Sequence, residues 1–494
     1  MDKPEAQIGP PQTGLEPNYT KPFVTITVLF FMWGFITVMN DVLIPFLKES
    51  FELTYFQAGL VQFAFFGAFF FVSLIYFGFS AIIRDPIGHL GYKNWIMISL
   101  VICGLGCCLF YPAAKNNQYV LFLGALFVLA SGVTILQIAA NPYAAILGKP
   151  ENASSRLNLA QGINSIGTTL APIAGGLLLY RVFAGPDGVT IQSIQLPYVI
   201  YGGLFFLLAL FVKFCNLPAF SSKGALSKGS GAFSYRHLRL GMIAIFMYVG
   251  AEVAIGSYLV NFSQEMGYAE PVGSLYLAYY WGGAMIGRLL GAISLSDSIR
   301  GARQHLFMVL VAVLITGLVY LVTAVRLDDG VFSMVFMTPR QIFPYLIIIA
   351  LNYGAFLLGR SQAGRMLGIF SLIAMAMLVV AALGSGDLAF WAAIGVGLFN
   401  SIMWSNIFTL AIKDLGDDTA QGSSLLVMMI VGGAVVPPIM GHVADLVGIQ
   451  LAFLVPALNY IYLTFYGFSG HRVIVTNGTS GSSGPKKPNG ESES

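Results

Sequence analysis

The chain has 494 residues, of which 57% are hydrophobic and only 10% are charged, and its mean hydropathy is +0.78. A soluble globular chain carries about 25% charged residues, so this composition excludes a soluble enzyme or binding module. The net charge of +3 gives no reason to expect a nucleic-acid partner. Apolar stretches of about 20 residues recur from end to end, and no ten-residue alternating strands interrupt them. We therefore expect an all-α, polytopic membrane protein in a lipid bilayer.

Hydropathy and helix breakers predict about fourteen membrane helices in two groups. The first group covers 22–47, 56–83, 94–113, 119–147, 157–182 and 197–216. The second group covers 237–265, 271–298, 304–326, 342–359, 365–384, 388–413, 420–446 and 450–468.

The segments outside these helices are polar. Residues 1–20 are Pro-rich and lack the layout of a cleaved signal peptide, so we expect a cytoplasmic N-terminal segment. Residues 471–494 are rich in Gly and Ser and are expected to be disordered. Residues 218–236 read as a cytoplasmic linker between an N-terminal half, 21–217, and a C-terminal half, 237–470.

Basic residues support this orientation. With a cytoplasmic N-terminus, the loops after the even-numbered helices lie inside, where Lys and Arg accumulate in membrane proteins. Those loops contain Arg84 and Lys93, Lys149 and Arg156, Arg300 and Arg303, Arg360 and Arg365, and Lys413. We expect a multi-pass membrane protein whose N-terminus lies in the cytoplasm.

The two halves resemble each other in order of features, as transporter repeats do. In both, a helix with polar residues is followed by a short charged loop and a helix with small residues and Pro. If each half began as six helices, the second half has two too many. We therefore expect an inserted helix pair at about 304–359.

Two carboxylates fall deep inside predicted helices. Asp41 lies in MWGFITVMNDVL, next to Asn40 and on the same face as Trp33 and Thr37. Glu252 lies in the first helix of the second half, one turn after Tyr248. A charge at the bilayer centre costs about 2.5–3.5 kcal/mol, so such residues usually face a pathway; a buried structural pair is the alternative.

Neutral polar residues form stripes on other helices. Thr134, Gln137 and Asn141 share one helix face, and Asn158, Gln161 or Ser165, and Thr168 share another. Amides donate and accept hydrogen bonds, so converging amide faces suit a ligand with many hydroxyl groups. The alternative is hydrogen bonding between helices, which membrane proteins use routinely.

Aromatic and basic residues complete the candidate site. Trp404 follows Asn400 by one turn, and Tyr276 and Tyr280 share a face of the eighth helix; flat rings of this kind can cover the C–H face of a sugar. Arg288, near a helix end expected to be cytoplasmic, should snorkel or close an inside gate. Arg84 is the second expected gating residue.

Motifs for chemistry are missing from the sequence. It contains no Walker loop, no G-x-S-x-G and no His, Cys and Asp cluster at metal spacing, and the four cysteines suggest no disulfide framework. We expect no enzyme activity and no cofactor, so uphill transport would need an ion gradient.

The residues do resemble a known family. MNDVLIPFLKESFELTYFQAGLVQ, QIAANPYAAILG, SRLNLAQGINSIGT, YVGAEVAIGSYLV and GDDTAQGSSLLVMMIVGGAVVPPIMG resemble motifs of the fucose and glucose/galactose sugar:cation symporters of the major facilitator superfamily. The resemblance covers nearly the whole chain apart from the termini and the segment near 304–359. It implies the major facilitator fold of two six-helix halves, here with the inserted pair.

The resemblance also implies roles for individual residues. Asp41 corresponds to the cation-linked carboxylate facing the central cavity, Asn158, Gln161 and Asn164 to sugar-side amides, and Trp404 to an aromatic lining that cavity. In one respect the chain departs from the fucose symporter, which has Glu where this chain has Gln137 and Gln where this chain has Glu252. This difference weakens the transfer of fucose specificity and of its proton pathway, and fits glucose/galactose members better.

The expected mechanism is import of a hexose with a cation as the two halves rock around a central sugar. Asp41, Asn40 and Glu252 are the cation-coupling candidates, and Asp41 is the metal ligand if the cation is Na⁺, which we slightly favour over H⁺. The expected sugar-binding residues are Thr37, Gln137, Asn141, Asn158, Gln161, Asn164, Tyr280, Asn400 and Trp404. An uncoupled facilitator, a symporter for fucose or N-acetylglucosamine, and a sugar sensor remain as alternatives. We expect a functional monomer.

Overall fold

The computed structural model describes residues 18–53, 55–177, 190–220, 230–268, 270–328 and 331–473. The predicted disordered tail therefore lies outside the described residues, apart from 471–473, and so does most of the N-terminal segment. Residues 221–229, in the predicted linker, also lie outside them.

The first half is a set of long helices joined by short connections. It consists of α1 (Thr20–Ser50), α2 (Tyr55–Ile82), α3 (Pro86–Leu90), α4 (Tyr92–Lys115), α5 (Tyr119–Ile146), α6 (Ala153–Leu177) and α7 (Gln195–Phe214), with 3₁₀ turns at Pro150–Asn152 and Ile191–Ile194. A 3₁₀ turn at Gly231–Ser234 leads into the second half.

The second half has more helices, and several are interrupted. It consists of α8 (Arg236–Glu265), α9 (Glu270–Ser294), α10 (Ala302–Ala324), α11 (Pro339–Gly359), α12 (Ala363–Leu383), α13 (Gly386–Asn400), α14 (Met403–Ala411), α15 (Thr419–Met428), α16 (Gly432–Val447), α17 (Ile449–Ala452) and α18 (Leu454–Phe465), followed by a π-helical turn at Tyr466–Gly470. Short 3₁₀ turns, Gly416–Asp418 and Met429–Val431, flank α15.

Twelve spans among the described residues are long and apolar enough to cross a membrane, rather than the fourteen expected. The two predicted helices outside this set are α6 and α9, of 25 residues each. Both are present as helices. Their apolar character is weakened by polar residues such as Asn158 and Gln161 in α6 and Arg288 in α9, which lie inside the bundle.

The all-helical prediction needs one small correction. A two-stranded antiparallel sheet joins α10 to α11, with β1 (Val325–Asp328) paired to β2 (Val331–Met334) in the register Val325 to Met334. A four-residue ladder of this size satisfies the backbone of a tight connection and forms no layer of its own. The architecture therefore remains a helical bundle.

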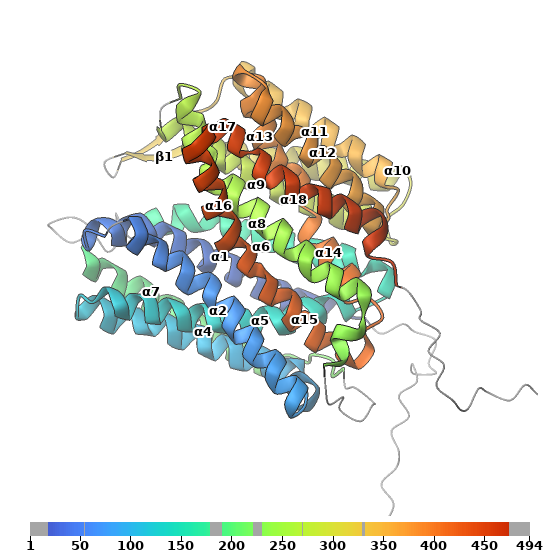
Figure 1. Cartoon of the computed structure of the whole chain (residues 1–494). Coiled ribbons are helices and arrows are strands. Elements are labelled where there is room, and N and C mark those ends of the chain that lie inside the picture. The colour runs from blue at the N-terminus through green and yellow to red at the C-terminus, as the bar shows by residue number, and fades with distance from the viewer. Residues whose placement is uncertain are drawn as a thin grey trace, which may run out of the picture.

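Helices pair in the same way within each half, and Figure 1 shows the two halves as a lower, blue-to-cyan layer and an upper, green-to-red layer. In the first half α1 packs on α6, α2 on α5, and α4 on both α5 and α7. In the second half α8 packs on α16, α9 on α13, and α12 on both α13 and α18. Both halves thus bury equivalent faces of equivalent helices.

In this pairing α10 and α11 have no counterpart in the first half. They lie at one edge of the upper layer, where α10 packs on α9 and α11 on α12 and α13 (Figure 1). Only 17% of the apolar window of α10 is buried, against 94% for the span formed by α13 and α14. The pair therefore covers the outside of the second half and does not reach its centre.

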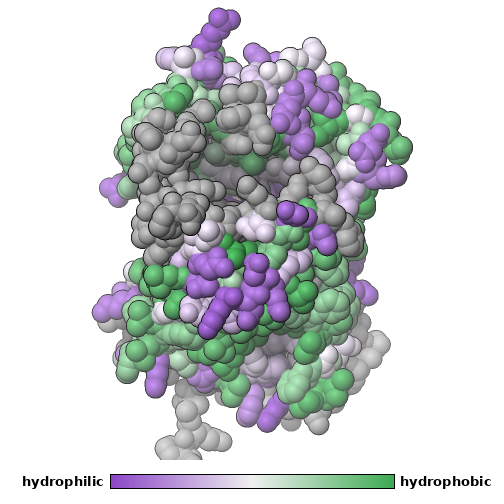
Figure 2. All heavy atoms as spheres, turned by 90° about the vertical axis from the view of Figure 1, so that its left-hand side faces the viewer, coloured by the Kyte–Doolittle hydropathy of each residue, from purple (hydrophilic) through white to green (hydrophobic). Residues whose placement is uncertain are grey.

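The two ends of the bundle differ. We call the end that carries residues 215–220 and 230–235 the linker end, and the opposite end, with β1 and β2, the far end (Figure 1). Among the described residues, the hydrogen bonds between the halves run from the linker end to about the middle of α6. Viewed from the far end, the surface is hollowed between the two halves (Figure 2). The described hydrogen bonds between the halves therefore lie between the linker end and the middle of the bundle.

Candidate functional site

Polar side chains of the first half converge in its interior, as the stripes predict. Gln137 and Asn141 of α5 are 4% and 0% exposed, and Gln161 of α6 is 4% exposed. Gln161 donates a long hydrogen bond of 3.5 Å from its amide nitrogen to Oδ1 of Asn141. Oγ1 of Thr37 in α1 and Nδ2 of Asn141 are buried without a hydrogen-bond partner. Since a buried polar group costs about 1–3 kcal/mol when left unpaired, these groups mark a place for a polar ligand or water.

Two of the predicted amides already form hydrogen bonds to other helices. Asn158 donates to the Ser154 carbonyl at 2.8 Å and to Oδ1 of Asn406 in α14 at 3.1 Å. Asn164 donates to the Phe30 carbonyl at 2.8 Å and so joins α6 to α1. Asn158 is fully buried, although its Oδ1 keeps no partner. In this state both residues contribute more to helix packing than to an open cavity.

The predicted second-half residues form a closed network. The Asn400 amide donates to the Tyr280 hydroxyl at 2.9 Å, and the Tyr460 hydroxyl donates to Oδ1 of Asn400 at 2.5 Å. The Tyr280 hydroxyl in turn donates to the Glu252 carbonyl at 3.1 Å. Asn400 and Tyr280 are 0% and 1% exposed, so both side chains are engaged and enclosed.

Glu252 and Arg288 form an ion pair inside the bundle. Nη2 of Arg288 lies 3.7 Å from Oε1 of Glu252, and each side chain is 13% exposed. The same carboxylate oxygen accepts a hydrogen bond of 2.7 Å from the Tyr248 hydroxyl, one turn earlier on α8. Another guanidinium nitrogen of Arg288 donates to Oγ of Ser165 in the first half at 2.6 Å, and the expectation that Arg288 snorkels or closes an inside gate stays a prediction. Its charge is neutralised by a carboxylate of its own half.

Trp404 lies at the start of α14 and is 7% exposed. Its ring stacks on Phe408 with centroids 6.1 Å apart and planes at 28°. The indole Nε1 is buried and has no hydrogen-bond partner. An indole N–H is a donor only, so this group can serve an acceptor oxygen of a ligand.

The side chains of Asn40 and Asp41 lie outside the described residues. Their backbone continues α1, and the neighbouring Met39 is 1% exposed, with its carbonyl accepting a hydrogen bond of 3.4 Å from the Tyr198 hydroxyl. The helix is therefore still packed inside the first half where these two residues begin.

Arg84 lies at the linker end, away from the central groups. It is exposed, and one of its guanidinium nitrogens lies 3.3 Å from Nε2 of His89. The next residue, Asp85, caps α3 by accepting from the Gly88 N–H at 2.9 Å and accepts from the Tyr76 hydroxyl at 2.6 Å. Burial raises the pKa of the Asp85 carboxyl, and the hydrogen bonds from Tyr76 and Gly88 oppose that rise.

A row of contacts between the halves, which we call the linker-side seam, was not expected from the sequence. Ser154 and Thr409 share a hydrogen bond of 2.6 Å, and Ser155 donates to the Ala292 carbonyl at 2.6 Å. Nη1 of Arg288 donates to Oγ of Ser165 at 2.6 Å. Nearer the linker end, the amide of Gln421 lies 3.4 Å from Oγ of Ser80, and Ser423 donates to the Ile138 carbonyl at 2.9 Å.

Sequence reasoning missed Tyr460, Asn406 and most of the seam. An intramembrane Asn such as Asn406 is itself a signal of a buried polar contact. The seam hydroxyls carry no comparable signal, because a lone Ser can satisfy itself against its own helix backbone, as Ser165 also does with the Gln161 carbonyl at 3.0 Å.

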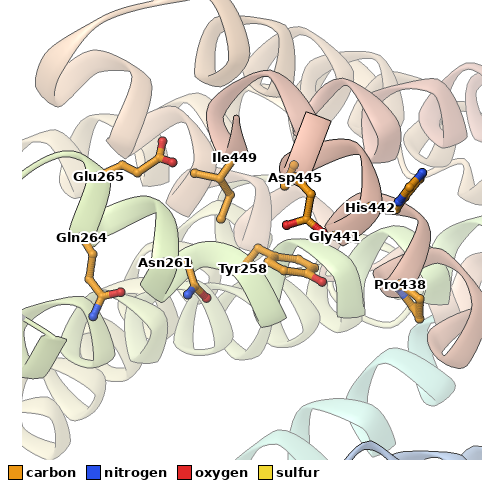
Figure 3. A pocket seen from close by; sticks show the side chains of 10 residues that line it. Tyr258, Asn261, Gln264, Glu265, Pro438, Gly441, His442, Asp445 and Ile449 are labelled. Carbon is orange, nitrogen blue, oxygen red and sulfur yellow. The ribbon is translucent and has the colours of Figure 1, made fainter. Parts of the chain in front are cut away.

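A separate cavity of about 790 Å³ lies near the far end, between α8 and α16. Tyr258, Asn261 and Glu265 line it from α8, and His442 and Asp445 from α16 (Figure 3). The Asp445 carboxylate points toward the Tyr258 ring (Figure 3). The Tyr258 hydroxyl packs against Gly441, where an added Cβ would overlap it. None of the predicted site residues whose side chains the structure describes lines this cavity.

Comparisons with known proteins agree with this arrangement. The profile of the Major Facilitator Superfamily matches residues 23–371. A protein of Brucella abortus biovar 1 (strain 9-941) named glucose/galactose transporter is 41% identical over 474 residues, which cover 93% of this chain and 97% of that protein. The L-fucose-proton symporter of Escherichia coli (strain K12) is 31% identical over 482 residues, covering 92% of this chain and 94% of that protein.

Solved structures give the same result. A crystal structure of the Escherichia coli fucose:proton symporter matches with a TM-score of 0.69 at 29% identity, covering 91% of this chain and 98% of that one. A second crystal structure of that transporter, described as in the outward conformation, matches with a TM-score of 0.68 at 30% identity. The helical halves, the buried polar groups between them and these matches together show that the chain belongs to the major facilitator superfamily, among relatives of the glucose/galactose and fucose transporters, a family of membrane transporters and not of enzymes.

Proposed function

We propose that this chain imports a hexose of the glucose or galactose type together with a cation, by alternating access of a central site. The observation that carries the proposal is that polar atoms of three residues on the predicted site faces, Thr37 Oγ1, Asn141 Nδ2 and Trp404 Nε1, are each buried without a hydrogen-bond partner. A hexose presents several hydroxyl groups that both donate and accept, so one ligand could pair all three. The name of the Brucella relative supports the substrate class.

The amides of Gln137, Asn141 and Gln161 are the proposed hydroxyl-binding groups, and the Trp404 ring is the proposed apolar wall. Asn158, Asn164, Asn400 and Tyr280 would support the site by holding helices in place, because their polar atoms already bind other helices. A sugar that reaches them would have to displace those bonds.

Asp41, with Asn40 beside it, is the proposed cation-linked carboxylate. A bare carboxylate inside a membrane bundle is costly and a neutralised one is not, so cation binding would bias which side opens. Na⁺ remains slightly favoured, since the departures at Gln137 and Glu252 separate this chain from the fucose symporter. Glu252 would take part in coupling through its ion pair with Arg288 rather than as a free cation ligand.

The linker end is proposed to be cytoplasmic, which follows from the basic residues of its loops in a bacterial inner membrane. We propose fourteen crossings, with α6 and α9 added to the twelve apolar spans, and with α10 and α11 as the inserted pair. At 1.5 Å per residue, 25 residues extend about 38 Å, enough for a hydrocarbon core of about 30 Å. Polar groups on α6 and α9 face protein, so these helices need less apolar surface. Within this membrane the chain is proposed to act as a monomer.

A second candidate is a fucose and proton symporter, which the name of the Escherichia coli relative favours. In that case protons would replace sodium at Asp41. N-acetylglucosamine is a further possible substrate on the same chemistry.

Uptake into proteoliposomes tests the proposal. Radiolabelled glucose, galactose, fucose and N-acetylglucosamine are offered with an imposed sodium gradient, an imposed proton gradient, or neither, for wild type and Asp41→Asn. We expect glucose or galactose to accumulate with one gradient, and the substitution to abolish that accumulation. Equilibration without a gradient, unchanged in Asp41→Asn, would instead indicate a facilitator. Binding without uptake would indicate a sensor.

A further inference from the structure

The Arg288 guanidinium touches both halves of the molecule. Its Nη1 donates to Oγ of Ser165 in the first half at 2.6 Å, while its Nε donates to the Ser401 carbonyl in the second half at 3.3 Å. The Glu252 carboxylate, also in the second half, is 3.7 Å away. The shortest of these contacts is therefore the one that crosses between the halves.

Opening the linker end requires the seam to separate. The seam joins α6 to α9 and α14, and α15 to α2 and α5. On α6, the bond from Arg288 to Ser165 lies deeper in the bundle than the bonds of Ser154 and Ser155. When α6 leaves α9, Ser154 and Ser155 lose neutral hydrogen bonds. Arg288 instead loses a hydrogen bond from a charged donor, which is worth about 1.5–3 kcal/mol.

Glu252 can replace the contact that Arg288 loses. It sits on the same half as Arg288 and would move with it, and its position is fixed by the Tyr248 hydroxyl at 2.7 Å. The distance of 3.7 Å in this state is longer than the 2.7–2.9 Å of a charge-assisted hydrogen bond, so the pair can tighten after Ser165 departs.

From these contacts we propose that Arg288 is a brace between the halves that exchanges Ser165 for Glu252 when the linker end opens, so that Glu252 determines how readily that end opens. The inference rests on the alternating access proposed above and assigns Glu252 and Arg288 a positioning role, not a contact with sugar. It explains why the acid and the base are both kept inside the membrane: each stabilises the other in a state where neither has a partner in the opposite half.

Spin-label distances across the linker end test the brace without any sugar. Labels are attached through Glu151→Cys in the first half and Arg303→Cys in the second, both exposed, in a background lacking Cys108 and Cys215. The protein is reconstituted in nanodiscs and distances are measured by double electron–electron resonance. We expect Glu252→Gln to deplete the long-distance, linker-open population about tenfold, the scale of a 1.4 kcal/mol shift. Ser165→Ala should enrich the same population.

Ser73→Ala is the matched control, because it removes a fully buried hydroxyl of the first half that has no hydrogen-bond partner. The double variant Glu252→Gln/Arg288→Gln removes both charges and should open more than Glu252→Gln alone. The brace is refuted if Glu252→Gln keeps the wild-type distance distribution, or if the double variant opens no more than the single one. Since no substrate is added, failure of sugar uptake would overturn the proposed function and leave this result standing.

Discussion

The two halves are alike in how α1 packs on α6 and α8 packs on α16. They differ in the hydrogen bonds that their buried polar side chains make. A Cβ at Gly167 of α6 would overlap the Phe31 carbonyl of α1, and a Cβ at Gly432 of α16 would overlap the Phe246 carbonyl of α8. Each half thus uses a glycine for close backbone approach at the same helix pair, as membrane helices commonly do.

The polar groups diverge. In the second half Asn400, Tyr280 and Tyr460 satisfy one another, whereas in the first half Thr37 and Asn141 keep unpaired polar atoms. The second half also contains an unpaired donor, Trp404 Nε1, outside this network.

The largest expected effect tests what the halves share. Gly167→Val and Gly432→Val each place side-chain atoms on a backbone carbonyl that cannot move aside, and each should cost about 4 kcal/mol or more. We expect both variants to be lost from the membrane fraction, or to elute as aggregates in fluorescence-detected size-exclusion chromatography. Gly203→Val and Gly354→Val are the controls, because open space surrounds both glycines. Normal folding of Gly432→Val alone would break the equivalence of the two helix pairs.

The next effect tests the hydrogen-bond network of Asn400, Tyr280 and Tyr460 in the second half. Asn400→Leu leaves the buried Tyr460 hydroxyl without its acceptor and should lower stability by about 1–3 kcal/mol, measured as a lower melting temperature in detergent. The double variant Asn400→Leu/Tyr460→Phe removes the orphaned hydroxyl and should recover part of the loss. Equal melting temperatures for wild type and Asn400→Leu would show that the network is not closed.

The smallest effect on stability is expected for Asn141→Leu, which should instead weaken the binding of a hexose. Asn141→Leu removes the unpaired Nδ2 and an Oδ1 whose bond from Gln161 is long at 3.5 Å, so we expect only a small fall in melting temperature. Hexose binding should be about tenfold weaker, the equivalent of one hydrogen bond. Isothermal titration in detergent measures the binding. Asn352→Leu is the matched control: this buried amide of α11 donates to the Leu398 carbonyl, and its loss should lower stability and spare affinity. The opposite pattern would place the ligand hydrogen bonds elsewhere.

The sequence by itself determined the membrane class and the approximate bounds of nearly every helix, because apolar length and breakers are local properties. It also identified Gln137, Asn141 and Gln161 as members of polar helix faces, since helical periodicity fixes which residues share a face. The count of apolar spans came out as twelve and not fourteen, because α6 and α9 carry polar residues that face protein.

Only the tertiary structure decided which of those polar groups are free. Asn400 meets Tyr280 and Tyr460 from 120 and 60 residues away in the chain, and Arg288 meets Ser165 from 123 residues away. No periodicity encodes these meetings, because an apolar helix face is equally compatible with lipid and with another helix. Whether a buried amide bonds to another helix or stays unpaired therefore depends on which residues pack next to it in the folded protein.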